Sequence, residues 1–258
     1  MFRTVFFFIV FWVYQLWIIP FLLRAIYLRR KGEGLQARRI AERLSIKWSR
    51  MNMAMAGATV TVTGSVDLPP DQSALVASNH MGAFDIPILA GYLGRPIAFI
   101  AKVELARVPL IGTWLPILGC ILLDRADRRQ RHVIIDRAAD ALKEGINLVI
   151  FPEATRSDGP YVRRFKSGAT RIAIRAGVPI IPVAMKGTYL LKQKHTWKIT
   201  PAEVEMIICP SIPTEGLTDN DAGALLERVR ATILKVLPDD HDREDVAAFT
   251  PGSGAKSA

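Results

Sequence analysis

Residues suited to metal binding or redox chemistry are scarce in this chain of 258 residues, which has two cysteines and four histidines. Cys120 and Cys209 lie far apart in apolar stretches, without the close spacing of metal ligands. We therefore expect no metal and a reducing compartment. The chain also lacks GxGxxG and GxxxxGK[ST], which bind nucleotide phosphates, and the GxSxG turn of α/β-hydrolases. We expect no bound cofactor and no serine nucleophile of that kind.

Acidic residues are nearly absent from the first 56 residues, where only Glu33 and Glu42 accompany ten Lys and Arg. This region carries a net charge of +8, so that only +2 of the total of +10 remains for the other residues. A nucleic-acid-binding protein would carry its basic face on the folded domain, so we expect no nucleic-acid partner. Positive charge beside the most apolar segment favours an anionic membrane surface.

No charge interrupts the apolar segment Thr4–Leu23. As a helix its 20 residues would be about 30 Å long, the thickness of a bilayer core. No small-residue cleavage site follows, which argues against a signal peptide. Gln15 and Pro20 interrupt the pattern, so a full span and an insertion into one leaflet both remain open. The segment is followed by basic residues, Arg24, Arg29, Arg30 and Lys31, which favour a cytoplasmic location for the rest of the chain.

A second helical pattern follows, with apolar residues at three- and four-residue steps: Ile40, Leu44, Trp48, Met51 and Met55. Basic residues occupy another face: Arg39, Arg43, Lys47 and Arg50. Such a helix either lies among lipid headgroups or packs on the protein core. We favour the headgroups because the helix follows the apolar segment. Residues 1–56 are therefore predicted to be a membrane-anchoring region.

From residue 57 onward, short apolar runs alternate with helical patterns. Strands are predicted at 59–64, 73–78, 96–101, 120–124, 147–152, 178–185 and 204–210. Helices are predicted at 86–93, 128–144, 167–176 and 219–237, and a helical stretch interrupted by Pro109 and Pro116 is predicted at 103–118. This alternation predicts an α/β fold with a largely buried central sheet flanked by helices. We expect a catalytic domain over 57–237 and a disordered tail over 238–258.

The stretch SNHMGAFD places His80 and Asp85 five residues apart, where a strand gives way to a helix. Residues five apart on one helix do not share a face, so they can meet only if His80 lies in the loop. At the start of a helix the dipole favours ionised aspartate and neutral imidazole, the form that acts as a base. The alternative is an aspartate that merely caps the helix. With no protein nucleophile evident, the base would activate a hydroxyl of the substrate.

Two further polar stretches follow predicted strands, where open α/β sheets place their ligands. In FPEATRS, Glu153 and Arg156 flank a small turn, and Arg156 offers several donors to a phosphate. In KVELARVPLIG, Lys102 would be a second cation at the same edge. The alternatives are a surface ion pair between Glu153 and Arg156, and a solvated lysine. The stretch VPIIPVAMKG is given only a shaping role.

These four stretches, in this order, resemble the four sequence blocks of the glycerolipid acyltransferase family. NHMGAFD resembles its NHx₄D block, KVELARVPLIG its second, FPEATRS its FPEGTRS block and VPIIPVA its fourth. The resemblance covers about residues 60–190. Ala154 stands where the family usually has glycine, which puts the geometry of that turn in question.

The resemblance implies that His80 is the general base, that Asp85 orients it, and that Glu153, Thr155 and Arg156 help to bind a glycerol-phosphate acceptor. It implies transfer of a fatty acyl group from acyl-CoA or acyl carrier protein to the sn-2 hydroxyl of 1-acylglycerol-3-phosphate, giving phosphatidic acid at the membrane. Other acceptors, such as lyso-ornithine lipid or glycerol-3-phosphate, remain open. So does a non-catalytic membrane protein that binds lipids.

Overall fold

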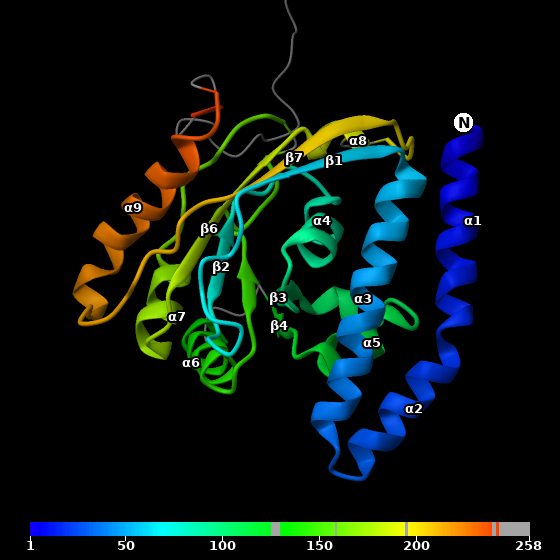
Figure 1. The fold of residues 1–258 in the computed structure, drawn as a ribbon, viewed down its shortest axis with the longest axis horizontal. Helices are drawn as coiled ribbons and strands as arrows, with labels where there is room; N and C mark the ends of the chain where they lie inside the picture. Colours follow the sequence, from blue (N-terminus) through cyan, green and yellow to red (C-terminus); the bar gives the residue numbers. More distant parts are fainter. Residues whose placement is uncertain (125–129, 158, 194–195, 239–240, 243–258) are drawn as a thin grey trace, which may run out of the picture.

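The computed structural model describes residues 1–124, 130–157, 159–193, 196–238 and 241–242. Within these residues, seven strands form one sheet in the order β1-β7-β6-β2-β5-β3-β4 (Figure 1). The strands are β1 (Ala58–Thr63), β2 (Leu75–Ser78), β3 (Ala98–Lys102), β4 (Ile121–Leu123), β5 (Leu148–Ile150), β6 (Ile180–Lys186) and β7 (Ala202–Ile208). Neighbouring strands are parallel except β6 and β7. The predicted α/β class is confirmed.

Helices cover both faces of the sheet (Figure 1). One face carries α6 (Gln130–Lys143), α7 (Gly168–Ala176) and α9 (Ala222–Leu234). The other carries α1 (Phe2–Trp17), α2 (Ile19–Arg30), α3 (Gly34–Ala56), α4 (Asp85–Tyr92) and α5 (Ile111–Leu118). Three short elements complete the fold: the 3₁₀ turns η1 (Val103–Arg107) and η2 (Asp219–Asp221), and α8 (Thr188–Leu191).

Alternation along the central strands builds two separate cores. On β2, Leu75 and Ala77 belong to the cluster under α6, α7 and α9, whereas Val76 belongs to the cluster under α3 and α4. Because successive side chains of a strand point to opposite faces, a strand covered on both sides reads as a continuous apolar run. This explains why LVAS is buried at every position.

The predicted interruption of the helical stretch at Pro109 is confirmed, because η1 and α5 lie on either side of it, whereas Pro116 lies inside α5 and does not interrupt it. Pro109 and Leu110 separate the two elements, and Leu110 has a φ of 64°, which no right-handed helix contains. The predicted helix over 219–237 begins as η2 and ends as α9 at Leu234. The other predicted strands and helices are present within a few residues of their predicted bounds, although residues 128–129 lie outside the described chain.

The apolar segment Thr4–Leu23 does not form one continuous helix. It is divided between α1 and α2, which are bent by 42° at a break around Ile18, close to Pro20. Among the described residues no single helix is long and apolar enough to cross a bilayer, whereas the bent pair passes that test together. The break follows from chemistry, because proline has no N–H for the helix ladder and is accepted readily in a first helical turn.

Helix α3 packs on the protein core. The sequence analysis favoured lipid headgroups as the surroundings of its apolar side chains, and the structure corrects that preference. Met53 and Ala56 are fully buried in the same cluster as Val76 of β2. On the α4 side, the Arg50 Nε–H donates to the carbonyl oxygen of Gly91 at 2.8 Å. Ile40, Leu44, Trp48, Met51 and Met55 are all half-buried. The predicted boundary between residues 1–56 and 57–237 therefore does not divide the hydrophobic core, because α3 shares a core cluster with β2.

The predicted disordered tail over 238–258 lies mostly outside the described residues. Two residues within it, His241 and Asp242, are described. His241 is buried, and Asp242 forms a bridge with Val162 and accepts a hydrogen bond from Arg230 at 2.5 Å. At these two positions the chain is packed against the domain.

Candidate active site

His80 and Asp85 are in direct contact, as the sequence predicts. His80 lies in the loop after β2, and Asp85 is the first residue of α4. His80 Nδ1 is 2.7 Å from Asp85 Oδ2. The His80 side chain is 11% exposed and the Asp85 side chain 0%. A buried carboxylate at Nδ1 places the proton of a neutral imidazole there, which leaves the lone pair of Nε2 for a substrate.

Asp85 is held by three further donors. The backbone N–H groups of Met81 and Gly82 donate to Asp85 Oδ2 at 2.7 and 2.9 Å. The Thr188 hydroxyl donates to Oδ1. None of these donors belongs to α4, so Asp85 does not act as a helix cap. Gly82 permits the close packing, because a Cβ there would lie 3.3 Å from the Thr188 carbonyl oxygen.

Phe151, the first residue after β5, fixes the plane of the imidazole. The ring centroids of His80 and Phe151 are 3.9 Å apart and the rings are inclined by 15°. The backbone of the loop is held as well, because the Ser157 N–H donates to the His80 carbonyl oxygen at 2.8 Å. Contacts to the ring and to the main chain thus hold the same residue.

Glu153 is buried beneath this loop, with 3% of its surface exposed. Its Oε1 accepts from the His80 backbone N–H at 2.7 Å, and its Oε2 accepts from the Arg163 backbone N–H at 3.0 Å. Burial raises the pKa of Glu153 to about 8, although the two N–H donors act in the opposite direction. The carboxyl group ties the His80 loop to the segment after β5 and is not paired with the Arg156 side chain in the described structure.

The other predicted residues lie at the same edge of the sheet. β2, β5 and β3 are adjacent and parallel, so their carboxyl ends point the same way. His80 follows β2, Thr155 and Arg156 follow β5, and Lys102 ends β3. Lys102, Thr155 and Arg156 are exposed and, within the described residues, make no hydrogen bond or ion pair with His80 or Asp85. Their direct role in binding stays a prediction.

Four contributors were not predicted: Asn79, Phe151, Ser157 and Thr188. Asn79 exchanges two hydrogen bonds with the Met185 backbone, at 2.7 and 3.1 Å, and so ties the start of the His80 loop to β6. Phe151 and Ser157 belong to a stretch already marked as polar and ligand-facing. Thr188 follows the fourth stretch directly, yet its contact with Asp85 depends on how β6 pairs with β2.

The backbone is strained at two described residues, Ala154 in the FPEATRS turn and Leu110 just before α5. Ala154 has a φ of 60° and Leu110 a φ of 64°, the left-handed region that favours glycine. At Leu110 the Ile111 N–H donates to the Pro109 carbonyl oxygen at 2.7 Å, which closes a three-residue turn of a rare and strained kind. The turn at Ala154 thus has the geometry for which glycine is suited, although this chain has alanine there.

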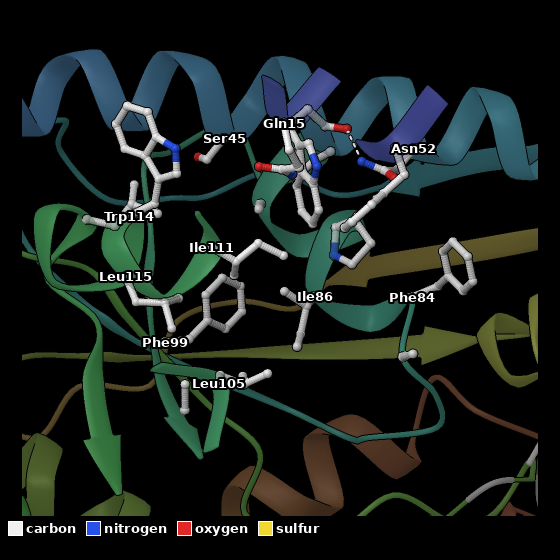
Figure 2. A pocket seen from close by; sticks show the side chains of 18 of the residues that line it. Gln15, Ser45, Asn52, Phe84, Ile86, Phe99, Leu105, Ile111, Trp114 and Leu115 are labelled. Atoms are coloured by element: carbon white, nitrogen blue, oxygen red, sulfur yellow. Dashed lines mark hydrogen bonds between the residues drawn. The ribbon is translucent and has the colours of Figure 1, made fainter. Parts of the chain in front are cut away.

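An apolar pocket of about 400 Å³ adjoins the site. It lies between α1 and α3 on one side and α4, β3 and α5 on the other (Figure 2). Its lining includes Phe11, Trp48, Phe99 and Trp114, and it reaches Phe84 in the loop that carries His80. Pockets of this size and apolarity bind small apolar ligands or chains.

The described residues contain no group of three His, Cys, Asp or Glu side chains placed to hold a metal ion. The two cysteine thiols are also poor candidates for a nucleophile. Burial raises the pKa of the Cys120 thiol to about 11 and raises the pKa of Cys209 as well. At this edge of the sheet, the described residues therefore offer the oriented imidazole of His80, next to the apolar pocket.

Comparison with known proteins agrees with this geometry. The family model described as acyltransferase matches residues 59–186, which include the His80 loop, the FPEATRS turn and β6. Residues 59–186 form a domain of the acyltransferase family. The family match excludes α1, α2 and α3, of which α1 and α3 form one side of the apolar pocket.

Relatives in the acyltransferase family are 1-acyl-sn-glycerol-3-phosphate acyltransferases. One from Homo sapiens is 32% identical over 181 residues, covering 70% of this chain and 64% of that protein. One from Chlamydomonas reinhardtii is 31% identical over 181 residues, 69% of this chain and 53% of that protein. The chain thus spans between half and two thirds of the length of these two relatives.

A solved structure is similar over nearly the whole chain. The 1-acyl-sn-glycerophosphate acyltransferase PlsC from Thermotoga maritima is 29% identical, with a TM-score of 0.78. The similarity covers 90% of this chain and 92% of that one, so it extends beyond the residues of the family match.

Proposed function

We propose that this protein is an O-acyltransferase that moves a fatty acyl group from a thioester, acyl-CoA or acyl carrier protein, to the sn-2 hydroxyl of 1-acylglycerol-3-phosphate. The product is phosphatidic acid. The observation that carries the proposal is the 2.7 Å contact between His80 and Asp85, next to an apolar pocket whose lining includes Phe84 of the same loop. The names of the relatives support the choice of acceptor.

His80 acts as the general base. Asp85 holds Nδ1 of the imidazole, so Nε2 is the atom that takes the proton of the acceptor hydroxyl. The oxygen of that hydroxyl attacks the thioester carbonyl in the same step. Asp85 stabilises the imidazolium that forms, and Phe151 holds the ring plane. The thiolate leaves with little acid assistance, because thiol pKa values are low, about 8.5 for cysteine. No acyl-enzyme is required.

The exposed cations at the carboxyl ends of β3 and β5 would hold the acceptor phosphate. Arg156 supplies a planar set of donors and Lys102 a point charge, with Thr155 adjacent. Glu153 contributes differently from what the family resemblance implies. Both its oxygens are occupied by backbone N–H groups, so we assign it a positioning role for the His80 loop. The acyl chain of the donor would occupy the apolar pocket.

The outer face of α1 supports a membrane location. Exposed apolar residues recur at helical spacing along it, namely Phe2, Val5, Phe6, Ile9, Trp12, Val13, Leu16 and Trp17. Soluble monomers rarely expose so continuous a patch. The opposite face of α1 is packed on the domain, where the Thr4 hydroxyl accepts from the Ile199 N–H at 3.0 Å. We propose that the helix lies in the cytoplasmic leaflet, with its outer face among the lipids and the site near the headgroups.

The deciding experiment uses the full chain, purified in detergent, and measures release of free thiol. Acyl-CoA and acyl carrier protein are offered with 1-acylglycerol-3-phosphate, glycerol-3-phosphate and lyso-ornithine lipid in turn. His80→Ala should lower turnover on the order of 10²–10⁴-fold without unfolding the protein. A preference for another acceptor would change the substrate assignment, and absence of thiol release with every pair would support a lipid-binding protein instead.

A further inference from the structure

Trp197, in the segment between α8 and β7, is the most exposed large apolar side chain described from residue 3 onward, with 77% of its surface accessible. The backbone beside it is held in place. The Ile199 N–H donates to the Thr4 hydroxyl at 3.0 Å, and the Thr200 N–H donates to the Leu191 carbonyl oxygen at 3.0 Å. An indole presented on a segment that is fixed in this way indicates a surface for contact with another body.

Trp197 extends the apolar outer face of α1. Its ring meets that of Phe8 edge to face, with the centroids 6.1 Å apart. Val5 and Trp12, three residues before and four residues after Phe8, lie on the same side of the helix and are 56% and 43% exposed. The apolar surface of α1, proposed above to lie among lipids, therefore continues onto the segment between α8 and β7.

Two lysines accompany the indole. Lys192 Nζ lies 5.8 Å from the centroid of the Trp197 ring, and Lys198, the next residue after Trp197, is exposed. Among the described residues neither lysine forms an ion pair. Tryptophan is enriched where a bilayer meets water, and lysine is attracted to anionic headgroups. An apolar protein partner would cover these charges without compensating them, so the combination fits an anionic bilayer surface better.

We propose that Lys192, Trp197 and Lys198 form a second membrane contact, which binds anionic lipid headgroups while the outer face of α1 lies among the lipid chains. The proposal rests on the proposed function, in which α1 lies in the cytoplasmic leaflet. Lys192 and Trp197 also belong to the lining of the apolar pocket, together with Phe8. The contact therefore places part of the pocket proposed for the donor chain at the headgroup region.

Vesicle flotation of the full chain tests the two lysines. It compares neutral phosphatidylcholine vesicles with vesicles that also contain phosphatidylglycerol, and the wild-type protein should bind the anionic vesicles at least about tenfold more tightly. Lys192→Gln and Lys198→Gln should each reduce this ratio by about fivefold. Lys143→Gln, at an exposed lysine of α6 on the other side of the sheet, is the matched control and should keep the ratio. Equal effects of all three substitutions would show attraction by net charge alone and would overturn the proposal.

The indole is tested by truncation and by its own fluorescence. Trp197→Ala should weaken flotation with both kinds of vesicle by at least about fivefold, whereas Val133→Ala, at a 48% exposed valine of α6, should not. The difference in emission between the wild-type protein and Trp197→Phe reports on Trp197, and it should move to shorter wavelength when vesicles are added. Unchanged flotation of Trp197→Ala, or a difference emission that does not move, would overturn the proposal.

These measurements use no acyl donor and no acceptor, so their outcome is independent of the proposed reaction. Loss of flotation in Val13→Asp with full flotation of Trp197→Ala would leave the contact of α1 in place and reject the second contact. A change of oligomeric state of Trp197→Ala in detergent, with vesicle binding unchanged, would assign the indole to a contact with a second copy of the chain and would also overturn the proposal.

Discussion

The Thr188 hydroxyl donates to Asp85 Oδ1, the carboxylate oxygen that does not face His80. The two residues are 103 positions apart in the chain, and both are fully buried. Asp85 Oδ2 contacts the imidazole, while Oδ1 is held by Thr188, the first residue of α8, which follows β6 directly. The orientation of the base therefore depends on the pairing of β6 with β2 as well as on the short loop itself.

Thr188→Val is expected to lower kcat by about tenfold, since the loss of one hydrogen bond to a charged group is worth about 1.5–3 kcal/mol. Without this donor Asp85 Oδ1 loses its anchor and the imidazole is held less firmly, so kcat should fall more than KM rises. Thr188→Ser should restore kcat. A serine variant that folds but stays as slow as Thr188→Val would point to a packing role only.

The His80 and Asp85 pair could be predicted because its geometry is local. A loop of five residues and one helix start decide whether the two side chains meet, and the sequence contains both. Thr188 and Asn79 could not be predicted, because their contacts exist only once β6 lies beside β2. Helix α3 shows a related limit. Its amphipathic pattern is equally typical of a membrane surface and of a protein core, and only the position of α4 decides between them.

Arg156→Ala is expected to raise KM for a phosphate-bearing acceptor by on the order of tenfold or more, with a smaller effect on KM for the acyl donor. The reason is the exposed position of Arg156 after β5, at the same sheet edge as His80. Removal of a charge-assisted hydrogen bond is worth about 1.5–3 kcal/mol. Saturation curves for the two substrates check this, with Arg137→Ala, an exposed arginine on α6, as control. A selective donor defect would assign Arg156 to the carrier.

Glu153 should make folding stability depend on pH. Burial raises its pKa from 4.5 to about 8, so the folded protein holds this proton more tightly than the unfolded chain does. Its contribution to stability is fully present below about pH 4.5 and is lost as pH rises toward 8. Denaturant unfolding between pH 5 and about 8 should show this fall, and Glu153→Gln should flatten it. An identical slope in the variant would assign the pH dependence to other groups.

Ala154→Gly is expected to raise the free energy of unfolding by roughly 0.5–1 kcal/mol. The left-handed conformation costs an ordinary residue about 1–2 kcal/mol, whereas the added freedom of glycine in the unfolded chain costs about 0.4–1 kcal/mol. The sequence alone predicts a small loss, and the φ of 60° reverses the sign. Ala54→Gly, at an exposed position in α3, is the control and should lower stability by about 1 kcal/mol. Activity of Ala154→Gly should stay within a few-fold.

Membrane binding should depend on the outer face of α1. Val13 is 57% exposed on that face, and Val133 is 48% exposed on α6, on the other side of the sheet. Val13→Asp should weaken flotation with neutral phosphatidylcholine vesicles by at least about tenfold, because burying a valine side chain is worth about 1.5–3 kcal/mol and the new charge must also stay hydrated.

Val133→Asp is the matched control for this test, because it introduces the same charge at a similarly exposed valine. It should leave flotation unchanged, and neutral vesicles remove any effect of net charge on the comparison. High salt should not release the wild-type protein, because apolar contact with the lipids would hold it. Equal flotation of the two variants, or release by salt alone, would show that α1 does not place its outer face in the bilayer.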